Sequence, residues 1–303
     1  MKNKSDILIY FKLFLTALFW GGTFIAGRIV TRDMGPFSAA FLRFTVAAAF
    51  LLLITWKVEG RLPLLSAKQF FIVFLLGMTG VFLYNTFFFK GLKIIDAGRA
   101  ALIVAINPVF IALFSALLFK EKFTPRKLTG VILSLTGAVT VISRGRILEI
   151  FDTGLGLGEG FIIGCVASWV AYTLLGKSAM RELSPLLTVS YAAVIGGVAL
   201  FLPACSEGLL RDLTHFSLAS WVSIFYLGIF GTVVAFVWYY EGIKKIGAMK
   251  ASQFINFVPV SAILLAFLIL AEPVTPSLII GGLFVTTGVY LANSPGKIPR
   301  QAR

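Results

Sequence analysis

The chain has 303 residues, of which 58% are hydrophobic and only 13% are charged, and its mean hydropathy is +0.95. About a quarter of the residues of an ordinary soluble domain are charged, so this composition excludes a soluble protein and indicates a membrane protein. The net charge of +14 does not indicate a nucleic-acid partner, because the Lys and Arg residues are scattered among short segments between apolar stretches, as is usual in membrane proteins.

Ten apolar segments follow one another with short connections. We predict helices over residues 10–30, 38–56, 69–89, 98–119, 126–143, 159–176, 185–204, 217–240, 248–270 and 276–293. The first segment has a basic start like a signal peptide, but its apolar run continues for about twenty residues without a small-residue cleavage site, which predicts a retained helix. The chain is therefore predicted to be an all-α integral membrane protein that forms one compact bundle.

The second half of the chain repeats the first. Adding 149 to the early residue numbers, or 151 from the third helix onward, brings identical residues into register. Such pairs are Trp20 and Trp169, Pro36 and Pro185, Pro108 and Pro259, Glu121 and Glu272, and Gly137 and Gly288. Five helices per unit is an odd number, so the second unit must enter the membrane from the opposite side. The sequence thus predicts ten transmembrane helices in two inverted five-helix repeats, residues 1–143 and 159–293.

The basic residues indicate the orientation. If both termini are cytoplasmic, eighteen of the 27 Lys and Arg residues fall in inner segments, eight fall in outer segments, and Arg43 lies within a helix. Residues 120–127 contain four basic residues, whereas the equivalent residues 271–278 contain none. Equivalent loops on opposite sides of a membrane should differ in this way, so we predict that both termini are cytoplasmic.

Four stretches carry the most distinctive sequence of the chain: LFWGGTFIAGR (18–28), PFSAAFLRFTVAAAFLLL (36–53), and the related stretches 101–141 and 251–292. They resemble the EamA-type members of the drug/metabolite transporter superfamily. The resemblance implies export or exchange of small metabolites, often amino acids, across a bacterial inner membrane. It also implies a central cavity lined by helices one, three and four and by their repeat partners, with helices five and ten at the periphery.

Two tryptophans at equivalent mid-helix positions, Trp20 and Trp169, are candidates for the wall of a substrate cavity. The alternatives are packing residues or an interfacial aromatic belt. Three amides in helices four and nine, Asn107, Gln253 and Asn256, could bind a zwitterion or a hydroxyl, or could join helices by hydrogen bonds. Further candidate substrate-binding residues are Tyr84, Asn85, Tyr172, Trp238 and Tyr239.

Arg43 lies several residues inside the second helix and could meet a substrate carboxylate. Snorkelling to the membrane surface, or a structural pair with a loop, is the interpretation that we favour from sequence. Lys90 and Glu241 are repeat partners of opposite charge, and are interpreted either as gate residues or as solvated helix ends. The prolines at 108 and 259 predict a kink, which is either a static bend or a hinge.

Glu121 and Glu272, at the ends of helices four and nine, are expected to bond the backbone of neighbouring loops. All Asp and Glu residues map to loops or helix ends, which favours a uniporter or exchanger over a proton antiporter. The leading hypothesis is a secondary transporter for a small neutral or zwitterionic metabolite such as an amino acid. The alternative is a nucleotide-sugar or nucleoside-type carrier, which basic residues in the cavity would favour.

An intramembrane enzyme and a membrane scaffold are remote alternatives. The only histidine, His215, lies in a loop, and no HExxH or paired-carboxylate motif is present in the sequence. Neither Cys165 nor Cys205 fits a metal spacing or a disulfide framework. We therefore expect no cofactor, no metal and no nucleic acid; the expected partners are a small-molecule substrate and the lipid bilayer, and a homo-oligomer remains open.

Overall fold

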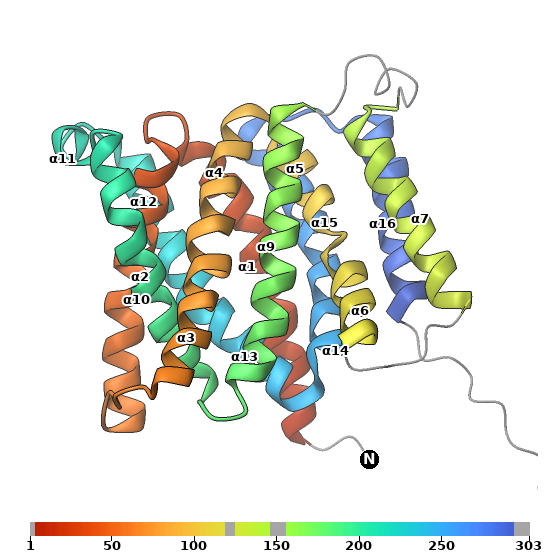
Figure 1. Ribbon diagram of the computed structural model, residues 1–303. Helices are drawn as coiled ribbons and strands as arrows, with labels where there is room; N and C mark the ends of the chain where they lie inside the picture. The colour runs from red at the N-terminus through yellow and green to blue at the C-terminus, as the bar shows by residue number, and fades with distance from the viewer. Residues whose placement is uncertain (1–3, 119–124, 146–155, 294–303) are drawn as a thin grey trace, which may run out of the picture.

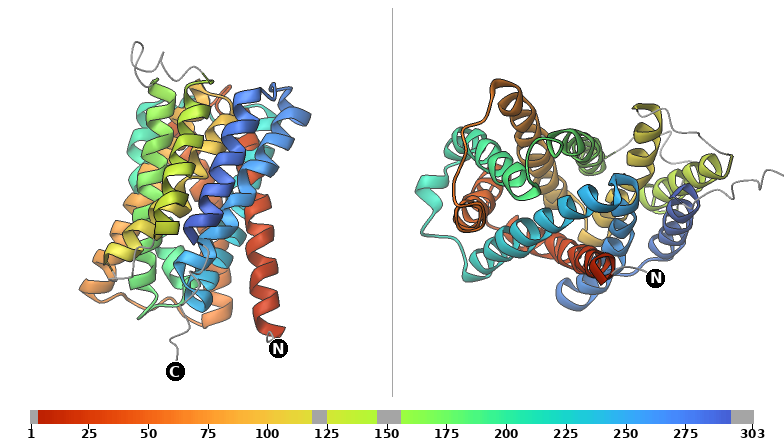
Figure 2. Two further views of the ribbon diagram at one scale, coloured as in Figure 1. Left: turned by 90° about the vertical axis from the view of Figure 1, so that its right-hand side faces the viewer. Right: turned by 90° about the horizontal axis from the view of Figure 1, so that it is seen from below.

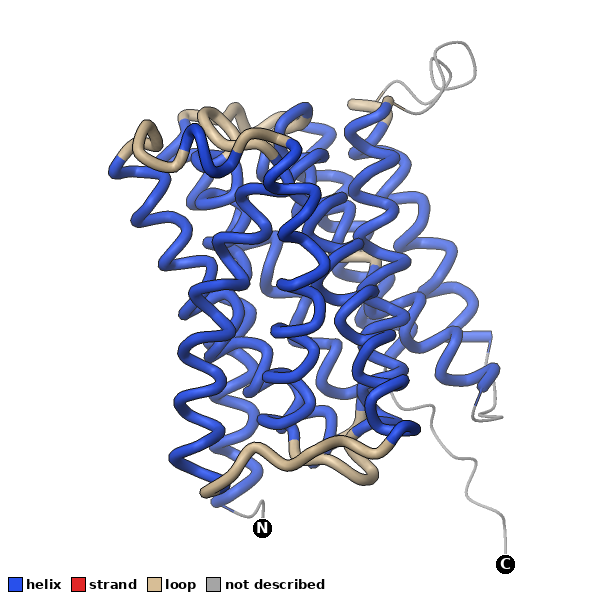
Figure 3. The backbone as a smooth tube through the Cα atoms, turned by 60° about the vertical axis from the view of Figure 1, so that its left-hand side comes forward, coloured by secondary structure: helices blue, strands red, loops and turns tan. Residues whose placement is uncertain are grey.

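The computed structural model describes residues 4–118, 125–145 and 156–293, and within these residues all regular structure is helical. The helices run side by side, and their connections gather at the two ends of the bundle (Figures 1 and 3). In the described part of the chain, eight helical stretches are long and apolar enough to cross a membrane, and two further apolar helices are shorter. The prediction of an all-α multi-pass membrane protein is therefore confirmed.

The helices of the first half are α1 (Lys4–Val30), α2 (Pro36–Glu59), α3 (Ala67–Leu76), η1 (Gly77–Leu83), α4 (Tyr84–Ile94), α5 (Ala97–Val104), α6 (Asn107–Leu118) and α7 (Pro125–Ile142). Those of the second half are α9 (Leu157–Ala179), α10 (Pro185–Ser206), α11 (Leu209–Asp212), α12 (Leu218–Gly228), η2 (Ile229–Val234), α13 (Ala235–Ile246), α14 (Ala248–Ser252), η3 (Gln253–Phe257), α15 (Val258–Leu270) and α16 (Pro276–Asn293). The start of α1 and the end of α16 lie at the same end of the bundle (Figure 1).

The helix ends follow from local sequence. Helices α2 and α10 begin at Pro36 and Pro185, whose fixed φ suits the first helical position and whose missing N–H would have no partner there. Ser184 accepts a hydrogen bond from the backbone N–H of Leu187 at the start of α10. Gly60 ends α2 with φ of 70°, a left-handed conformation that glycine adopts without strain.

Two membrane helices contain a π-helical segment. The segment η1 joins α3 to α4, and η2 joins α12 to α13 at an equivalent point, since adding 151 to residues 77–83 gives 228–234. Polar side chains bond the carbonyls that these segments displace: Asn85 Nδ2 donates to Val81 O at 2.9 Å, and Thr232 Oγ1 donates to Leu227 O at 2.9 Å. Both helices are thus interrupted in the same way near their middle.

Two further helices are broken where the sequence predicted continuous helices over 98–119 and 248–270. The first is interrupted at residues 105–106, directly before Asn107 and Pro108, because proline supplies no N–H to continue the ladder. The second passes through the 3-10 segment η3 just before Pro259. Both prolines therefore follow an interruption of the helix: the first interruption is a turn, and the second is a change of helix type.

Helices α7 and α16 pack against each other at one edge of the bundle (Figure 2). A Cβ added to Gly288 would lie 2.3 Å from the backbone nitrogen of Ser134, and one added to Gly137 would lie 2.6 Å from the carbonyl oxygen of Gly281. The two backbones thus approach as closely as glycine allows. This position at the edge is the one that the resemblance implies for helices five and ten.

Acidic side chains near one end of the bundle bond backbone N–H groups at helix starts. Glu272 accepts from Ala97 N at 3.0 Å and from Gly98 N at 3.1 Å, so its expected bonding to a neighbouring backbone is observed. Glu207 likewise accepts from Ser38 N at 2.8 Å. Each carboxylate stabilises the positive end of a helix and ties one half of the chain to the other. Glu121, for which the same role was expected, lies outside the described residues.

Candidate functional site

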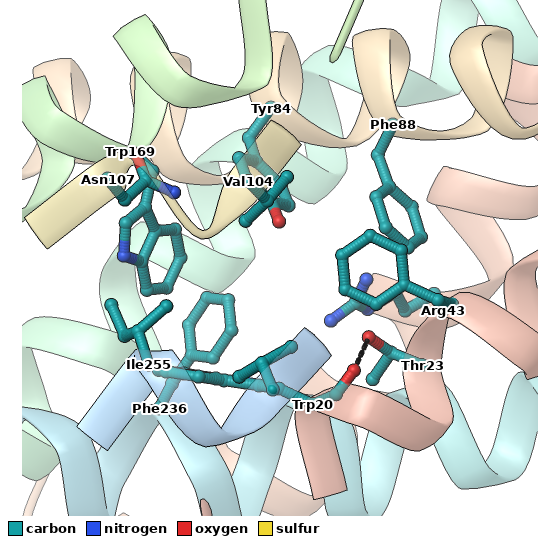
Figure 4. Close-up of a pocket in the computed structure, with 12 residues that line it drawn as sticks. Trp20, Thr23, Arg43, Tyr84, Phe88, Val104, Asn107, Trp169, Phe236 and Ile255 are labelled. Carbon is teal, nitrogen blue, oxygen red and sulfur yellow. Dashed lines mark hydrogen bonds between the residues drawn. The ribbon is translucent and has the colours of Figure 1, made fainter. Parts of the chain in front are cut away.

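A small cavity of about 30 Å³ lies at the centre of the bundle (Figure 4). Its lining comes from both halves of the chain: α1, α2, α4, α5, α6, α9, α13, η3 and α15. The lining residues are Trp20, Thr23, Phe24, Arg43, Tyr84, Phe88, Val104, Asn107, Trp169, Phe236, Ile255 and Val258. A space of this volume holds on the order of one water molecule, so the cavity is too small for a metabolite in this conformation.

Aromatic rings form most of the wall. The rings of Trp20 and Trp169 meet edge to face with centroids 5.2 Å apart, and Phe236 lies 5.2 Å from Trp169. Tyr84 lies 5.3 Å from Trp169 on the other side. Trp20 and Trp169 are 9% and 4% exposed, so neither belongs to an interfacial belt. The four rings offer a solute apolar faces with polar edges.

A hydrogen bond to the backbone fixes the orientation of the Trp20 indole. Trp20 Nε1 donates to the carbonyl oxygen of Gly231 at 3.1 Å, and that carbonyl belongs to η2. Thr23 Oγ1 donates to the carbonyl oxygen of Trp20 at 2.6 Å, which the dashed line in Figure 4 marks. A side chain of the first half is thus anchored on the π segment of the second.

The sequence-based preference for a snorkelling or loop-paired Arg43 is wrong. This residue is 2% exposed and lies in the core, at the wall of the cavity. Its Nη1 donates to Asn85 Oδ1 at 2.9 Å, its Nε to Thr232 Oγ1 at 2.9 Å, and its Nη2 to the carbonyl oxygen of Gly231 at 3.3 Å. Gly231 and Thr232 belong to η2, and Asn85 lies two residues beyond the end of η1, so these bonds join the two helices that contain π segments.

Asn107 is the second polar side chain of importance at the wall. It is 1% exposed, and neither its Oδ1 nor its Nδ2 has a hydrogen-bond partner among the residues that the structure describes. Buried amides are nearly always bonded, and leaving one unbonded costs about 1–3 kcal/mol. Figure 4 shows this amide at one end of the cavity and the guanidinium of Arg43 at the other.

The structure brings together four of the predicted substrate-binding residues, because Trp20, Tyr84, Asn107 and Trp169 all line the cavity. Three more lie directly behind its wall. Asn85 accepts from the guanidinium of Arg43, and the rings of Tyr172 and Tyr239 lie 5.2 and 5.7 Å from that of Trp169.

The remaining three predicted residues do not line the cavity. Trp238 is half-buried, with Lys12 Nζ at 5.7 Å from its ring centroid. Gln253 and Asn256 are half-buried in η3, where Ile255 lines the cavity instead. The prediction assumed an α-helical period over residues 248–270, whereas a 3-10 segment has a tighter turn and presents a different residue to the core.

Three aromatic residues that line the cavity, Phe24, Phe88 and Phe236, were not predicted from the sequence. Among the many phenylalanines of the chain, no sequence signal distinguishes them from packing residues. For Arg43 a signal did exist, because a charge within a membrane segment is a functional-site hypothesis by default.

The proposed gate residues have different partners at equivalent positions. Glu241 forms an ion pair with Lys12, with 2.7 Å between Oε2 and Nζ. Lys90 instead lies over the rings of Phe37 and Phe161, with its Nζ 5.0 and 5.6 Å from their centroids. Lys12 is therefore held against the opposite half of the chain by charge, whereas Lys90 lies over one ring from each half.

Within the residues that the structure describes, no group of three or more His, Cys, Asp or Glu side chains could hold a metal ion. The cavity wall itself offers a cation, an amide, a hydroxyl and aromatic rings. Such a wall can bind and orient an organic solute by hydrogen bonds and apolar contact.

Comparison with known proteins identifies the family. A sequence model of the EamA-like transporter family matches residues 7–143 and again residues 156–294. The chain is 30% identical to the uncharacterized transporter YyaM of Bacillus subtilis over 292 residues, covering 96% of this chain and 95% of the relative. It is 32% identical to an uncharacterized transporter of Archaeoglobus fulgidus over 281 residues, covering 92% and 96%.

A probable terminal-alkyne amino-acid exporter of Streptantibioticus cattleyicolor is 26% identical over 284 residues, covering 93% of this chain and 92% of the relative. A crystal structure with 21% sequence identity has the same fold, with a TM-score of 0.63 and coverage of 96% of this chain and 97% of the other. The family and these relatives point to a non-enzymatic membrane transporter. The resemblance found in the sequence is confirmed: the chain belongs to the EamA-like transporter family, within the drug/metabolite transporter superfamily.

Proposed function

We propose that this protein is a secondary transporter that exports or exchanges a small neutral or zwitterionic metabolite, such as an amino acid, by alternating access. The observation that carries the proposal is the central cavity, which is built from both halves of the chain and contains Arg43 and the unbonded amide of Asn107. In a core that served only for packing, a buried cation and an unbonded amide would not contribute to stability. A solute that binds there would supply the missing hydrogen bonds.

Two inverted repeats, residues 1–143 and 159–293, are the architecture that we propose for this mechanism. Support comes from the π segments and the helix breaks, which occur at equivalent positions of the two halves. Inverted repeats let one half take the conformation of the other, so that the site faces each side of the membrane in turn. The charge distribution supports cytoplasmic termini in a bacterial inner membrane.

Two interfaces that the repeat would relate are packed differently, as alternating access requires. A Cβ added to Gly21 of α1 would lie 1.9 Å from the Oγ of Ser261 in α15, so these helices are in close contact. The equivalent residues of α9 and α6, Val170 and Phe110, instead line an apolar groove of about 680 Å³. We infer that the first interface is closed in this conformation and that the second is partly open.

The amino-acid hypothesis is favoured over the nucleotide-sugar alternative. Several basic residues in the cavity would favour a diphosphate, but Arg43 is the one Lys or Arg among the lining residues of the described chain. One relative is named a probable amino-acid exporter, which agrees with a small solute. Uptake of labelled amino acids into liposomes containing the purified protein tests the proposal; uptake no faster than into protein-free liposomes would contradict it.

A further inference from the structure

Arg43 is a buried cation whose bonded partners, in the described part of the chain, are all uncharged. They are an amide oxygen, a hydroxyl and a backbone carbonyl. No Asp or Glu is among the residues that line the cavity. Burying an unpaired charge away from water costs free energy, so an anionic partner would stabilise the guanidinium in this arrangement.

The guanidinium keeps donors for such a partner. Three of its five N–H groups are used by Asn85, Thr232 and Gly231, which leaves one N–H on each terminal nitrogen. Figure 4 shows these nitrogens directed toward the interior of the cavity. The three neutral acceptors hold the planar group in place, so binding would require little further ordering of the side chain.

We propose that Arg43 binds a carboxylate group of the transported solute. The rest of the solute lies along the rings of Trp20 and Trp169, and Asn107 bonds a second polar group at the far end. This assignment rests on the proposed transport function and narrows it to solutes with a free carboxylate. Because the cavity is small in this conformation, it must widen beyond its present volume when the solute enters.

One guanidinium suits a monocarboxylate better than other anions. A carboxylate is planar and carries a single negative charge, so its two oxygens match the arginine fork and neutralise it. A phosphate monoester carries close to two negative charges and would leave one unpaired among apolar rings. Chloride would neutralise the charge but would make no contact with the aromatic wall or with Asn107.

The test compares acids with their amides. Purified full-length protein in liposomes takes up labelled leucine and phenylalanine, and unlabelled leucine, phenylalanine, leucinamide and phenylalaninamide are added as competitors. The amides keep the ammonium group and the side chain but lack the carboxylate. We expect each amide to compete at least about tenfold more weakly than its parent acid, because a charge-assisted bond is lost.

Variants then assign the discrimination to Arg43. In Arg43→Lys the charge remains but the planar fork is lost, and we expect the acid-to-amide ratio to fall several-fold. In Arg43→Gln the ratio should approach one. Arg99→Gln is the control, because Arg99 is a half-buried arginine that is paired with Glu159 at 2.7 Å and does not line the cavity. Its acid-to-amide ratio should equal that of the parent.

Three results would overturn the assignment. The first is that amides compete as well as acids in the parent, and the second is an unchanged acid-to-amide ratio in folded Arg43→Lys. The third is that the effect of Arg43 on the melting temperature is seen with chloride and is not seen with the amino acids. If Arg43→Gln does not fold, Arg43→Lys decides. Absence of any amino-acid uptake by the parent would overturn the proposed function and the assignment together, whereas uptake without acid-to-amide discrimination would overturn the assignment alone.

Discussion

Trp20 and Trp169, which occupy equivalent positions in the two halves, touch edge to face at the centre of the bundle with their planes at 85°. The two rings thus form adjacent parts of the cavity wall. A change in the relative position of the two halves must separate the rings or slide one past the other. The indole of Trp20 is additionally bonded to the carbonyl oxygen of Gly231. These two contacts make Trp20 a sensitive position at which to test whether the cavity is a binding site.

Trp20→Phe should slow transport while leaving stability close to that of the parent. Phenylalanine retains an aromatic face toward Trp169 but cannot donate to Gly231, a neutral bond that contributes about 0.5–1.5 kcal/mol. Trp20→Ala should abolish transport and cost about 3–5 kcal/mol of stability. Liposome uptake and thermal unfolding in detergent measure the two effects. Transport by Trp20→Phe at the parental rate would favour a purely structural role.

Asn107→Leu should separate stability from function. Its amide is buried and unbonded, so an apolar side chain of similar shape should leave the melting temperature unchanged or raise it, while transport falls. Asn85→Leu is the matched control: that amide is equally buried but is fully bonded, and its loss leaves a guanidinium donor unpaired, at a cost of about 1–3 kcal/mol. A large destabilisation in Asn107→Leu would show that this amide has a structural partner.

Gly288→Leu should force α7 and α16 apart. The Cβ position at residue 288 is 2.3 Å from a backbone nitrogen, which cannot rotate away, so we expect a loss of about 1–3 kcal/mol or more. Gly160→Ala is a suitable control, because no atom of the described residues lies within 4 Å of its Cβ position and alanine favours a helix by about 1 kcal/mol. Thermal unfolding of the two variants should therefore shift in opposite directions.

The lowered pKa of Asp33, which lies in the connection between α1 and α2, predicts that the protein loses stability in acid. Partial burial acts to raise the pKa of this carboxyl, but hydrogen bonds from Ser220 and Ser217 outweigh it and hold the pKa below its ordinary value. A lowered folded-state pKa contributes stability that is present above the unfolded value of about 3.9 and is lost as the pH falls through the folded value. Between pH 5 and pH 3, in round numbers, the melting temperature should fall more in the parent than in Asp33→Asn. Parallel acid profiles would contradict this role.

Thiol labelling tests the orientation. In a background with Cys165→Ala and Cys205→Ser, Arg61→Cys carries a single thiol in the connection between α2 and α3, and Arg211→Cys carries one in α11; these two segments lie at opposite ends of the bundle (Figure 1). A membrane-impermeant reagent added to intact cells should modify the thiol at 211 and spare the one at 61. The reverse pattern would invert the proposed topology.

Much of the architecture could be predicted from sequence because the bilayer leaves few alternatives. An apolar stretch about twenty residues long must be a helix, and short connections keep consecutive helices adjacent. Prolines at 36 and 185 mark helix starts, and those at 108 and 259 mark interruptions. These signals depend on local chemistry alone.

The details of the cavity could not be predicted in the same way. The side of a helix that faces the core depends on its turn, and the turn changes at η1, η2 and η3. This is why Ile255 lines the cavity where Gln253 and Asn256 were expected. The partners of Arg43 lie 42, 188 and 189 residues away along the chain, so only the folded structure brings them together.

The π segment η1 also means that a count of residues, and not only their identity, determines which side chains reach the cavity. A π turn holds more residues than an α turn, so a deletion of one residue within Gly77–Leu83 would convert the segment to α-helix with little rotation of the part beyond it, whereas a deletion within the following α-helix would turn everything beyond it by about 100°. A deletion between Tyr84 and Phe88 would therefore turn Phe88 away from the wall although Phe88 itself had not been changed. Substitutions do not test this property, whereas single-residue deletions should show it as a milder loss of function within the two equivalent π segments than in the α-helical turns beside them.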